Sequence, residues 1–219
     1  MQKRGLQAIL FDMDGTLIDT IEDIQNAING ALSTKALEPI SQEQTKGVVG
    51  KGLQNALKGA LALHNEEVDE STFQQMYKHM IELYHEHYAD YSHPYEGVVQ
   101  LLGKLRSDGC ILGILSNKED ELTQRIVKKV LPSIDFLWVS GLKADEPRKP
   151  DKYGVDQFCQ IAGLLHDQVL YVGDSEVDYY TAKNAGCPVL LVSWGFREKK
   201  ELLALSDAVV VDSVVELED

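Results

Sequence analysis

The stretch Phe11-Asp12-Met13-Asp14-Gly15-Thr16 follows a short apolar run at residues 8–11. A run of consecutive apolar residues is typical of a strand that is buried on both faces of a parallel sheet. If the backbone stays extended beyond this run, the side chains of Asp12 and Asp14 point to the same side, because side chains alternate along a strand. Gly15 then allows a sharp turn. The sequence therefore predicts two carboxylates at the exit of the first strand.

Similar apolar runs recur along the chain, and helical patterns lie between them. The further strand candidates are residues 111–115, 136–139, 169–172, 189–192 and 208–211. The helix candidates are residues 96–107, 119–130, 152–162 and 177–184. Alternation of strands and helices favours a parallel sheet with right-handed crossover connections. We therefore predict an α/β fold with a Rossmann-like parallel sheet.

Residues 19–92 interrupt this alternation. Apolar side chains in this region recur at helical spacing, as Ile24 and Ile28 do, and no run typical of a strand occurs. One main domain with a smaller insertion also fits a chain of 219 residues. We predict an all-helical inserted domain at residues 19–92, and an α/β core at residues 1–18 and 93–219.

The composition limits the partners of this chain. Its 21 Lys and Arg and 35 Asp and Glu residues give a net charge of −14. Such an acidic chain argues against nucleic acid or an anionic membrane as a partner, because both bind clustered Lys and Arg. No apolar stretch approaches the ~20 residues that a membrane span needs, and no signal-peptide pattern is visible. Three widely spaced cysteines without a CxxC pair indicate reduced thiols. We expect a soluble cytoplasmic protein, whose oligomeric state the sequence does not indicate.

Polar residues follow three further strand candidates. Ser116 and Asn117 follow the second strand, and Lys149 lies in the loop after the third. Asp174 and Asp178 follow the fourth strand. In open parallel sheets, ligands bind beyond the carboxyl ends of the strands. We therefore expect these side chains to converge with the two carboxylates of the first strand.

Four carboxylates in one crevice would repel one another. Two unit charges ~4 Å apart repel by ~4 kcal/mol at an effective dielectric constant near 20. Either the pKa values of these groups rise or a cation neutralises them. Oxygen ligands without a nearby His or Cys favour Mg²⁺ over zinc. We therefore predict a Mg²⁺ site, which together with Lys149 would let an acidic protein bind an anionic substrate.

The four motifs DMDGT, SN, RKP and GDSEVD, in this order and each at a predicted strand exit, resemble those of the haloacid dehalogenase superfamily. The resemblance covers nearly the whole chain. It implies that Asp12 attacks phosphorus as a nucleophile and that Asp14 serves as general acid and then as general base. It also implies that Ser116, Asn117 and Lys149 bind the phosphoryl group. Ser116-Asn117 on its own would equally fit the N-cap of a helix.

The same resemblance implies the ligands of the metal ion. Mg²⁺ would be bound by the carboxylate of Asp12, the backbone carbonyl of Asp14 and the carboxylate of Asp174. Asp178, one helical turn beyond Asp174, would support the metal through water or a hydrogen bond. Asp178 also fits an acidic residue that complements the dipole of a helix in its first turn.

The position of the predicted insertion is similar to that of the helical cap of this superfamily, which would exclude water from the site. The finer pattern, including the segment 193–197, is similar to phosphoglycolate phosphatases. This resemblance implies a small phosphorylated metabolite as the substrate, with 2-phosphoglycolate as first choice. Lys51, in a glycine-rich loop, and Arg197 are candidates for contacting the substrate, although both also fit solvated side chains.

Other functions stay open at this point. One is a sugar phosphomutase of the β-phosphoglucomutase type, and another is a phosphatase for a different small phosphate. A third belongs to another class, namely a non-catalytic binding or regulatory domain. A phospho-accepting receiver domain would be shorter and would have no helical insertion after its first strand. Dehalogenation is disfavoured, because it has no use for Asp14 or for a metal ion.

Overall fold

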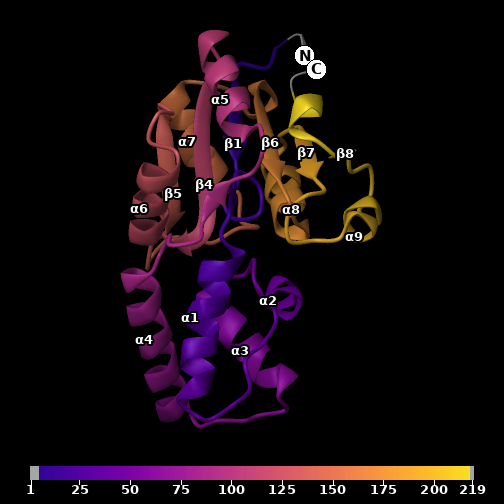
Figure 1. Cartoon of the computed structure of the whole chain (residues 1–219). Coiled ribbons are helices and arrows are strands. Elements are labelled where there is room, and N and C mark those ends of the chain that lie inside the picture. The colour runs from indigo at the N-terminus through magenta and orange to yellow at the C-terminus, as the bar shows by residue number, and fades with distance from the viewer. Residues whose placement is uncertain (1–4, 218–219) are drawn as a thin grey trace. The chain divides into compact units, whose positions relative to one another are not determined.

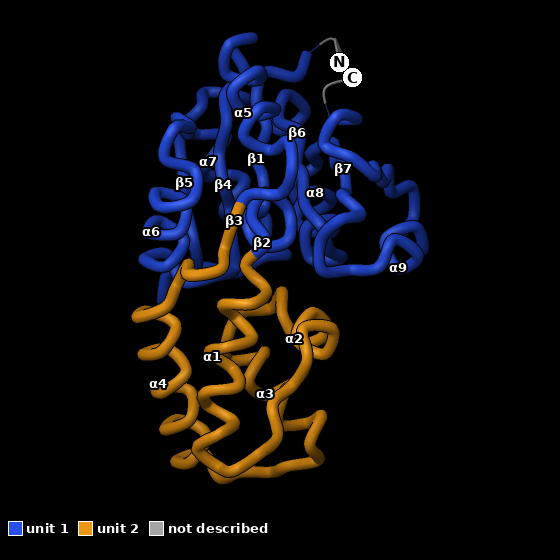
Figure 2. Tube along the Cα trace, viewed as in Figure 1, with its two compact units in different colours: residues 1–19, 94–219 blue, residues 20–93 orange. Residues whose placement is uncertain are grey.

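The computed structural model describes residues 5–217 of the chain, which divides into two compact units. Of the described residues, the core unit contains those up to Asp19 and those from Pro94 onward, and the helical unit consists of Thr20–His93 (Figure 2). The chain passes from one unit to the other at β2 (Ile18–Asp19) and β3 (His93–Pro94), which pair as a two-stranded sheet.

The core unit contains a six-stranded sheet with the strand order β5-β4-β1-β6-β7-β8 (Figure 1). All five neighbouring pairs of strands are parallel. The strands are β1 (Ala8–Phe11), β4 (Ile111–Glu119), β5 (Trp138–Leu142), β6 (Val169–Gly173), β7 (Val189–Val192) and β8 (Val210–Val211). This arrangement confirms the predicted α/β fold with a parallel sheet.

Helices connect the strands and cover the sheet. They are α5 (Val98–Ser107), α6 (Asp120–Val130), α7 (Tyr153–Ala162), α8 (Glu176–Ala185) and α9 (Lys199–Leu203), with 3₁₀ turns at η1 (His166–Gln168) and η2 (Val214–Leu217). Phe158 of α7 and Ala182 of α8 pack with Leu10 and Tyr171 in one hydrophobic cluster, so both helices cover the same face. Helix α5 lies on the other face (Figure 1). Burial of both faces explains why the strands are continuously apolar.

The register of the sheet brings the strand exits to the same level. Phe11 at the end of β1 lies opposite Ile114 of β4 and Val172 of β6. Asp12 therefore leaves the sheet beside the residues that follow Ile114 and Val172. Strand β4 extends to Glu119, beyond the predicted end at residue 115, with an irregular register against β5 between Leu115 and Glu119.

The helical unit contains α1 (Ile21–Ser33), α2 (Gln42–Val48), α3 (Leu53–Leu63) and α4 (Glu70–Glu86). Helices α1 and α4 approach closely at Gly30, where a Cβ atom would lie 2.2 Å from Leu83 Cδ1. Ser41 begins α2 with a capping box, and Asp69 begins α4 by accepting the N–H of Thr72 at 3.0 Å.

A single carboxylate joins the first turn of α1 to the segment that follows α4. Asp23 is 3% exposed and accepts the N–H groups of Asp90 at 3.2 Å, Tyr91 at 3.1 Å and Ser92 at 2.7 Å. These bonds satisfy three backbone donors that have no partner in a helix. They hold the first and last segments of the helical unit together.

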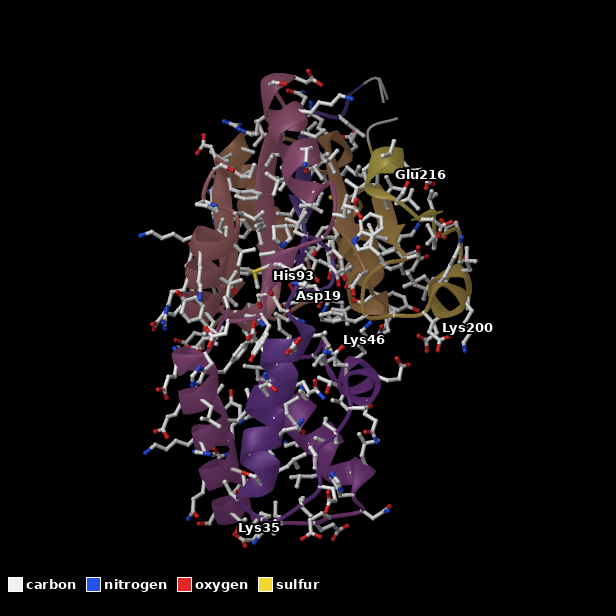
Figure 3. All side chains as sticks on the ribbon, in the orientation of Figure 1. Asp19, Lys35, Lys46, His93, Lys200 and Glu216 are labelled. Carbon is white, nitrogen blue, oxygen red and sulfur yellow. The ribbon has the colours of Figure 1, made fainter. Side chains whose placement is uncertain are left out.

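Charged side chains cover the outside of both units, and the labelled Lys35 and Lys200 extend away from the ribbon (Figure 3). Both lysines are exposed. Among the described residues, no helix is both long and apolar enough to cross a membrane.

Candidate active site

Asp12 and Gly15 occupy the turn that leaves β1. The N–H of Asp12 donates to Val172 O of β6 at 2.8 Å, which continues the pairing of the strands by one residue. Gly15 has a φ of 81°, and a Cβ atom at this position would lie 2.3 Å from Asp174 Oδ2. Only glycine fits here, because the turn needs a left-handed conformation and the carboxylate of Asp174 approaches the backbone.

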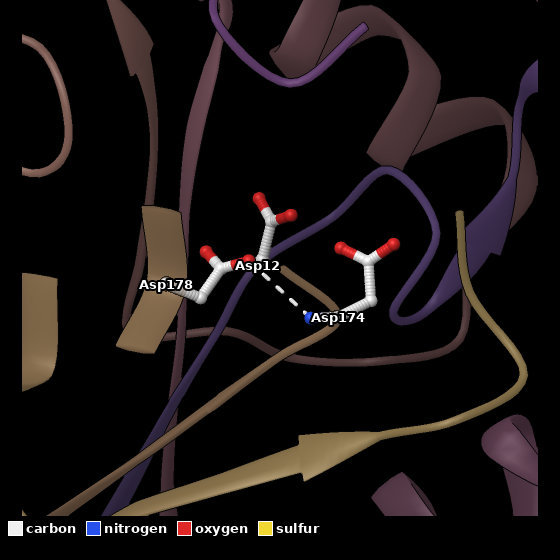
Figure 4. A group of neighbouring side chains, drawn as sticks. All are labelled: Asp12, Asp174 and Asp178. Atoms are coloured by element: carbon white, nitrogen blue, oxygen red, sulfur yellow. Dashed lines mark hydrogen bonds between the residues drawn. The ribbon is translucent and has the colours of Figure 1, made fainter. Parts of the chain in front are cut away.

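Three carboxylates gather where β1 and β6 end. Oxygen atoms of Asp12, Asp174 and Asp178 all lie within 4.8 Å of one another, and the three side chains lie side by side in Figure 4. Their exposed fractions are 7%, 3% and 0%. Asp12 follows β1, Asp174 follows β6, and Asp178 lies in the first turn of α8. The structure therefore brings these three predicted site residues together.

Lys149 neutralises part of this cluster. Its Nζ atom lies 2.7 Å from Asp12 Oδ1 and 2.8 Å from Asp178 Oδ1, and the side chain is 4% exposed. Asn117 holds the backbone of this lysine: the N–H of Lys149 donates to Asn117 Oδ1 at 2.9 Å, and Asn117 Nδ2 donates to Lys149 O at 3.1 Å. The side-chain amide of Asn117 thus positions Lys149.

The pKa values show how strongly the carboxylates interact. Burial raises the pKa of Asp12 well above its usual value, and the charges of Asp178 and Asp174 raise it further although Lys149 opposes them. Burial and the charge of Asp178 raise the pKa of Asp174 to about 7. Burial alone would lower the pKa of Lys149, but Asp12 and Asp178 raise it above the usual value. Three buried carboxylates with one lysine leave an excess of negative charge, which a divalent cation would neutralise.

Asp178 is bound by protein groups on both of its oxygens. Oδ2 accepts Ser175 Oγ at 2.6 Å, Ser175 N at 3.2 Å and Asp174 N at 3.3 Å. Oδ1 accepts Lys149 Nζ at 2.8 Å and the hydroxyl of Tyr171 at 3.4 Å. Asp178 therefore caps the start of α8, as one interpretation of the sequence suggested, and it also orients both Asp174 and Lys149.

Asp14 faces strand β4. Ser116 Oγ donates to Asp14 Oδ2 at 3.3 Å, and Lys118 Nζ lies 2.9 Å from Asp14 Oδ1. Lys118 was not among the predicted site residues, and it stands at the start of a charged run, residues 118–120. The sequence did contain a signal that could have identified Lys118. Ser116 and Lys118 are two residues apart and so point to the same side of an extended strand.

The loop after β7 contacts both the first and the fourth motifs. The N–H of Phe196 donates to Asp174 Oδ2 at 2.6 Å. The indole of Trp194 donates to Thr16 O at 3.1 Å. Within this segment the sequence suggested a role only for Arg197, and the structure shows that Phe196 positions Asp174.

The two candidates for substrate contact lie in different units. Arg197 Nε donates to Glu176 Oε2 at 3.0 Å, and its positive charge partly opposes the rise that burial causes in the pKa of Asp174. Lys51 lies in the exposed loop between α2 and α3 of the helical unit. A role of either residue in substrate binding stays a prediction.

Gly195→Ala should weaken the predicted Mg²⁺ site and destabilise the core unit. A Cβ atom at Gly195 would lie 2.3 Å from Asp174 Cβ and 2.5 Å from Gly15 O, so the backbone or the carboxylate must move. Overpacking of this kind costs about 1–3 kcal/mol. We expect at least a tenfold loss of Mg²⁺ affinity by calorimetry, which corresponds to about 1.4 kcal/mol.

Gly103→Ala in α5 is the matched control, because a Cβ atom at Gly103 would meet no heavy atom within 4 Å. It should leave Mg²⁺ affinity unchanged and slightly raise the free energy of unfolding, since alanine is favoured over glycine within a helix. Equal Mg²⁺ affinity of both variants would contradict the role of the loop after β7.

Comparison with known proteins agrees with this geometry. Residues 9–192 match the family model of the haloacid dehalogenase-like hydrolases. A phosphoglycolate phosphatase of Chromobacterium violaceum is 30% identical over 220 residues, which cover 100% of this chain and 98% of that protein. A phosphoglycolate phosphatase of Caulobacter vibrioides is 32% identical over 87% of this chain and 81% of that protein.

A solved structure is also similar over its whole length. It is a candidate phosphoglycolate phosphatase from Lactobacillus delbrueckii subsp. bulgaricus, with a TM-score of 0.87 and 30% identity. The match covers 98% of this chain and 97% of that one. The family match spans β1 to β7 and so includes Asp12, Lys149 and Asp174. The chain therefore belongs to the haloacid dehalogenase-like hydrolase family.

Proposed function

We propose that the protein is a Mg²⁺-dependent phosphatase that hydrolyses a small phosphate monoester through an aspartyl-phosphate on Asp12, with 2-phosphoglycolate as the first candidate substrate. The main support is the placement of Asp12, a buried carboxylate 2.7 Å from the ammonium group of Lys149 at the exit of β1. Relatives that match along the full chain and carry the name phosphoglycolate phosphatase support the choice of substrate.

In the first step, a carboxylate oxygen of Asp12 forms a bond to phosphorus. The bond from phosphorus to the ester oxygen breaks, and this oxygen takes its electron pair and a proton from Asp14. Lys149 and Ser116 bind the transferring group, and Asn117 contributes by holding Lys149 in place. Their hydrogen bonds stabilise the negative charge that spreads over the phosphoryl oxygens.

In the second step, a water molecule attacks phosphorus, and Asp14 takes a proton from it. The bond from phosphorus to the Asp12 oxygen breaks, which restores the carboxylate and releases inorganic phosphate. Asp14 thus returns to the protonated form in which it began. The two steps together consume one ester and one water molecule.

The residues present fit a magnesium ion. Oxygen donors and an excess of buried negative charge are what this cation requires. The Asp12 carboxylate, the Asp14 carbonyl and the Asp174 carboxylate would bind it, with Asp178 in support. When bound, Mg²⁺ supplies positive charge that neutralises the carboxylates and polarises a phosphoryl oxygen.

We further propose that the helical unit is the cap of the enzyme and that Lys51 and Arg197 contribute to substrate selection. Lys51 is exposed, whereas the side chain of Arg197 is 14% exposed and is paired with Glu176. A cytoplasmic location fits the three free cysteines.

A panel of small phosphate esters tests this function. The purified protein should hydrolyse 2-phosphoglycolate faster than sugar phosphates or aryl phosphates in Mg²⁺, and the activity should vanish in EDTA and return with added Mg²⁺. Isomerisation of a sugar phosphate instead of phosphate release would favour a mutase. Full turnover in EDTA would exclude the metal, and the absence of all turnover would favour a binding domain.

The affinity for Mg²⁺ should fall as the pH drops below about 7. Burial and the charge of Asp178 raise the pKa of Asp174 to about 7 in the metal-free protein, so below this pH the carboxylate carries a proton that Mg²⁺ must displace. Above this pH Asp174 no longer contributes a displaced proton, so the pH dependence becomes weaker. The apparent dissociation constant should rise by up to about tenfold per pH unit on the acidic side. Calorimetric titrations above and below this pH would measure the dissociation constant. A constant that does not change with pH would contradict the competition between Mg²⁺ and the proton on Asp174.

A further inference from the structure

Lys118 is a buried lysine that the two steps above do not use. Its side chain is 2% exposed, and its ammonium group lies 2.9 Å from Asp14 Oδ1. The other carboxylate oxygen, Asp14 Oδ2, accepts the hydroxyl of Ser116 at 3.3 Å. Strand β4 therefore holds both oxygens of the Asp14 carboxylate from two side chains that point the same way.

Lys118 is itself fixed by its surroundings. Its N–H donates to Ser116 Oγ at 3.1 Å, and its carbonyl accepts the buried hydroxyl of Thr123 in α6 at 3.3 Å. A Cβ atom at Gly141 of β5 would lie 2.5 Å from this carbonyl, so the neighbouring strand is packed closely against Lys118. The backbone of Lys118 is therefore held in place by its neighbours.

Burial of a lysine needs a physical reason. An ammonium group removed from water loses hydration that one ion pair often does not restore, and an apolar side chain of similar volume is commonly as stable. Stability alone therefore does not explain a lysine at position 118. Its ammonium group is paired with Asp14, whose side chain keeps 17% exposure and so is open to a ligand.

We propose that Lys118 is a positioning residue that fixes the orientation of Asp14 for proton transfer. A general acid acts only within hydrogen-bond reach of the oxygen that it protonates, so the orientation of its carboxylate affects the rate directly. Without Lys118, the carboxylate loses the ion pair at Oδ1 and is held less firmly. This inference rests on the role of Asp14 in the proposed function.

The leaving group provides a specific test. An alkyl phosphate needs a proton on its leaving oxygen, whereas p-nitrophenolate departs readily without one. Lys118→Met should therefore lower kcat for an alkyl phosphate by about 10²-fold, which is part of the 10²–10⁴-fold effect of a general acid. The first turnover of p-nitrophenyl phosphate should slow by less than about tenfold.

The second half-reaction gives an independent readout. Asp14 also serves as the base for the attacking water, so its misorientation should slow hydrolysis of the aspartyl-phosphate. Rapid-mixing measurements on Lys118→Met should show a burst of nearly one p-nitrophenolate per enzyme, followed by slow turnover. A folded Lys118→Met protein that shows no burst would overturn the proposal.

A double-mutant cycle with Asp14→Ala shows whether Lys118 acts through Asp14. If it does, Lys118→Met should cause almost no additional loss in the Asp14→Ala background. Lys118→Arg, which keeps the charge, should restore part of the alkyl phosphatase activity. Lys183→Met is the matched control, because this lysine of the core unit is 40% exposed and pairs with Asp207, and it should behave like the wild type.

Other outcomes separate the two proposals. If the wild-type protein hydrolyses no phosphate ester, the proposed function fails, and the role of Lys118 fails with it. The positioning role is wrong if the wild type is active and two results are found together. Lys118→Met would then raise KM equally for both esters, and it would cause its full loss of activity in the Asp14→Ala background as well. In that case Lys118 binds the phosphoryl group. Lys118→Gln provides the same comparisons should Lys118→Met fail to fold.

Discussion

Asp12→Asn should reduce kcat for every phosphate ester by at least about 10⁴-fold, because a neutral amide oxygen is a poor nucleophile and no aspartyl-phosphate can form. Asp12 is 7% exposed and is paired with Lys149, so no neighbouring carboxylate can replace it without a rearrangement of the buried cluster. The measurement is steady-state hydrolysis of 2-phosphoglycolate and of an aryl phosphate, together with a search for a phosphorylated enzyme by mass spectrometry.

The fold of this variant should survive. Asp12→Asn removes one of three buried like charges, and Lys149 keeps its partner Asp178 at 2.8 Å. The midpoint of thermal unfolding without metal should therefore stay near the wild-type value or rise. Asp145→Asn, which alters an exposed aspartate of the core unit, is the control and should keep full activity. A rate near that of the wild type for Asp12→Asn would refute the assignment of the nucleophile.

Lys149→Met should damage both activity and stability. The ammonium group of Lys149 binds Asp12 and Asp178, and all three side chains are at least nine-tenths buried. Removing one partner from a buried ion pair costs about 3–5 kcal/mol, because the remaining charges stay out of water without a counter-ion. Loss of a donor to the transferring phosphoryl group should lower kcat by about 10²–10³-fold.

Urea unfolding with and without Mg²⁺ would separate these contributions. Mg²⁺ should restore part of the lost stability of Lys149→Met, since the cation neutralises the same carboxylates, but it should not restore kcat. Lys152→Met provides the control, because that lysine is 57% exposed and pairs with Asp156 only at the surface. If Lys149→Met unfolded at the wild-type urea concentration and kept its rate within tenfold, the assigned role of Lys149 would be wrong.

The parallel sheet could be predicted from the sequence because its strands are buried on both faces. A short continuous apolar run such as Val169–Gly173 is best buried as a strand that is covered on both faces. The ends of the strands were less predictable. Strand β4 continues through polar residues to Glu119, because Ser116 and Lys118 find partners in Asp14 and a polar side chain can then be buried.

The convergence of Asp12, Asp174 and Asp178 followed from the rule that parallel strands end at one edge of the sheet. The partners of each side chain did not follow from it. The amide of Asn117 holds the backbone of Lys149, a role that the sequence did not indicate, while its binding of phosphate stays a prediction. The contact between Asn117 and Lys149 joins residues 32 positions apart in the chain. The spacing of apolar residues within one segment cannot predict such a contact.

Asp23 has a consequence for how proteins of this architecture can diverge. Its carboxylate binds the N–H groups of residues 90–92, so the entry and the exit of the helical unit are joined within that unit itself. An inserted segment with both ends fastened in this way can be exchanged for another of different length without altering the order of the strands. The helical unit and the parallel sheet can then diverge on separate parts of the gene.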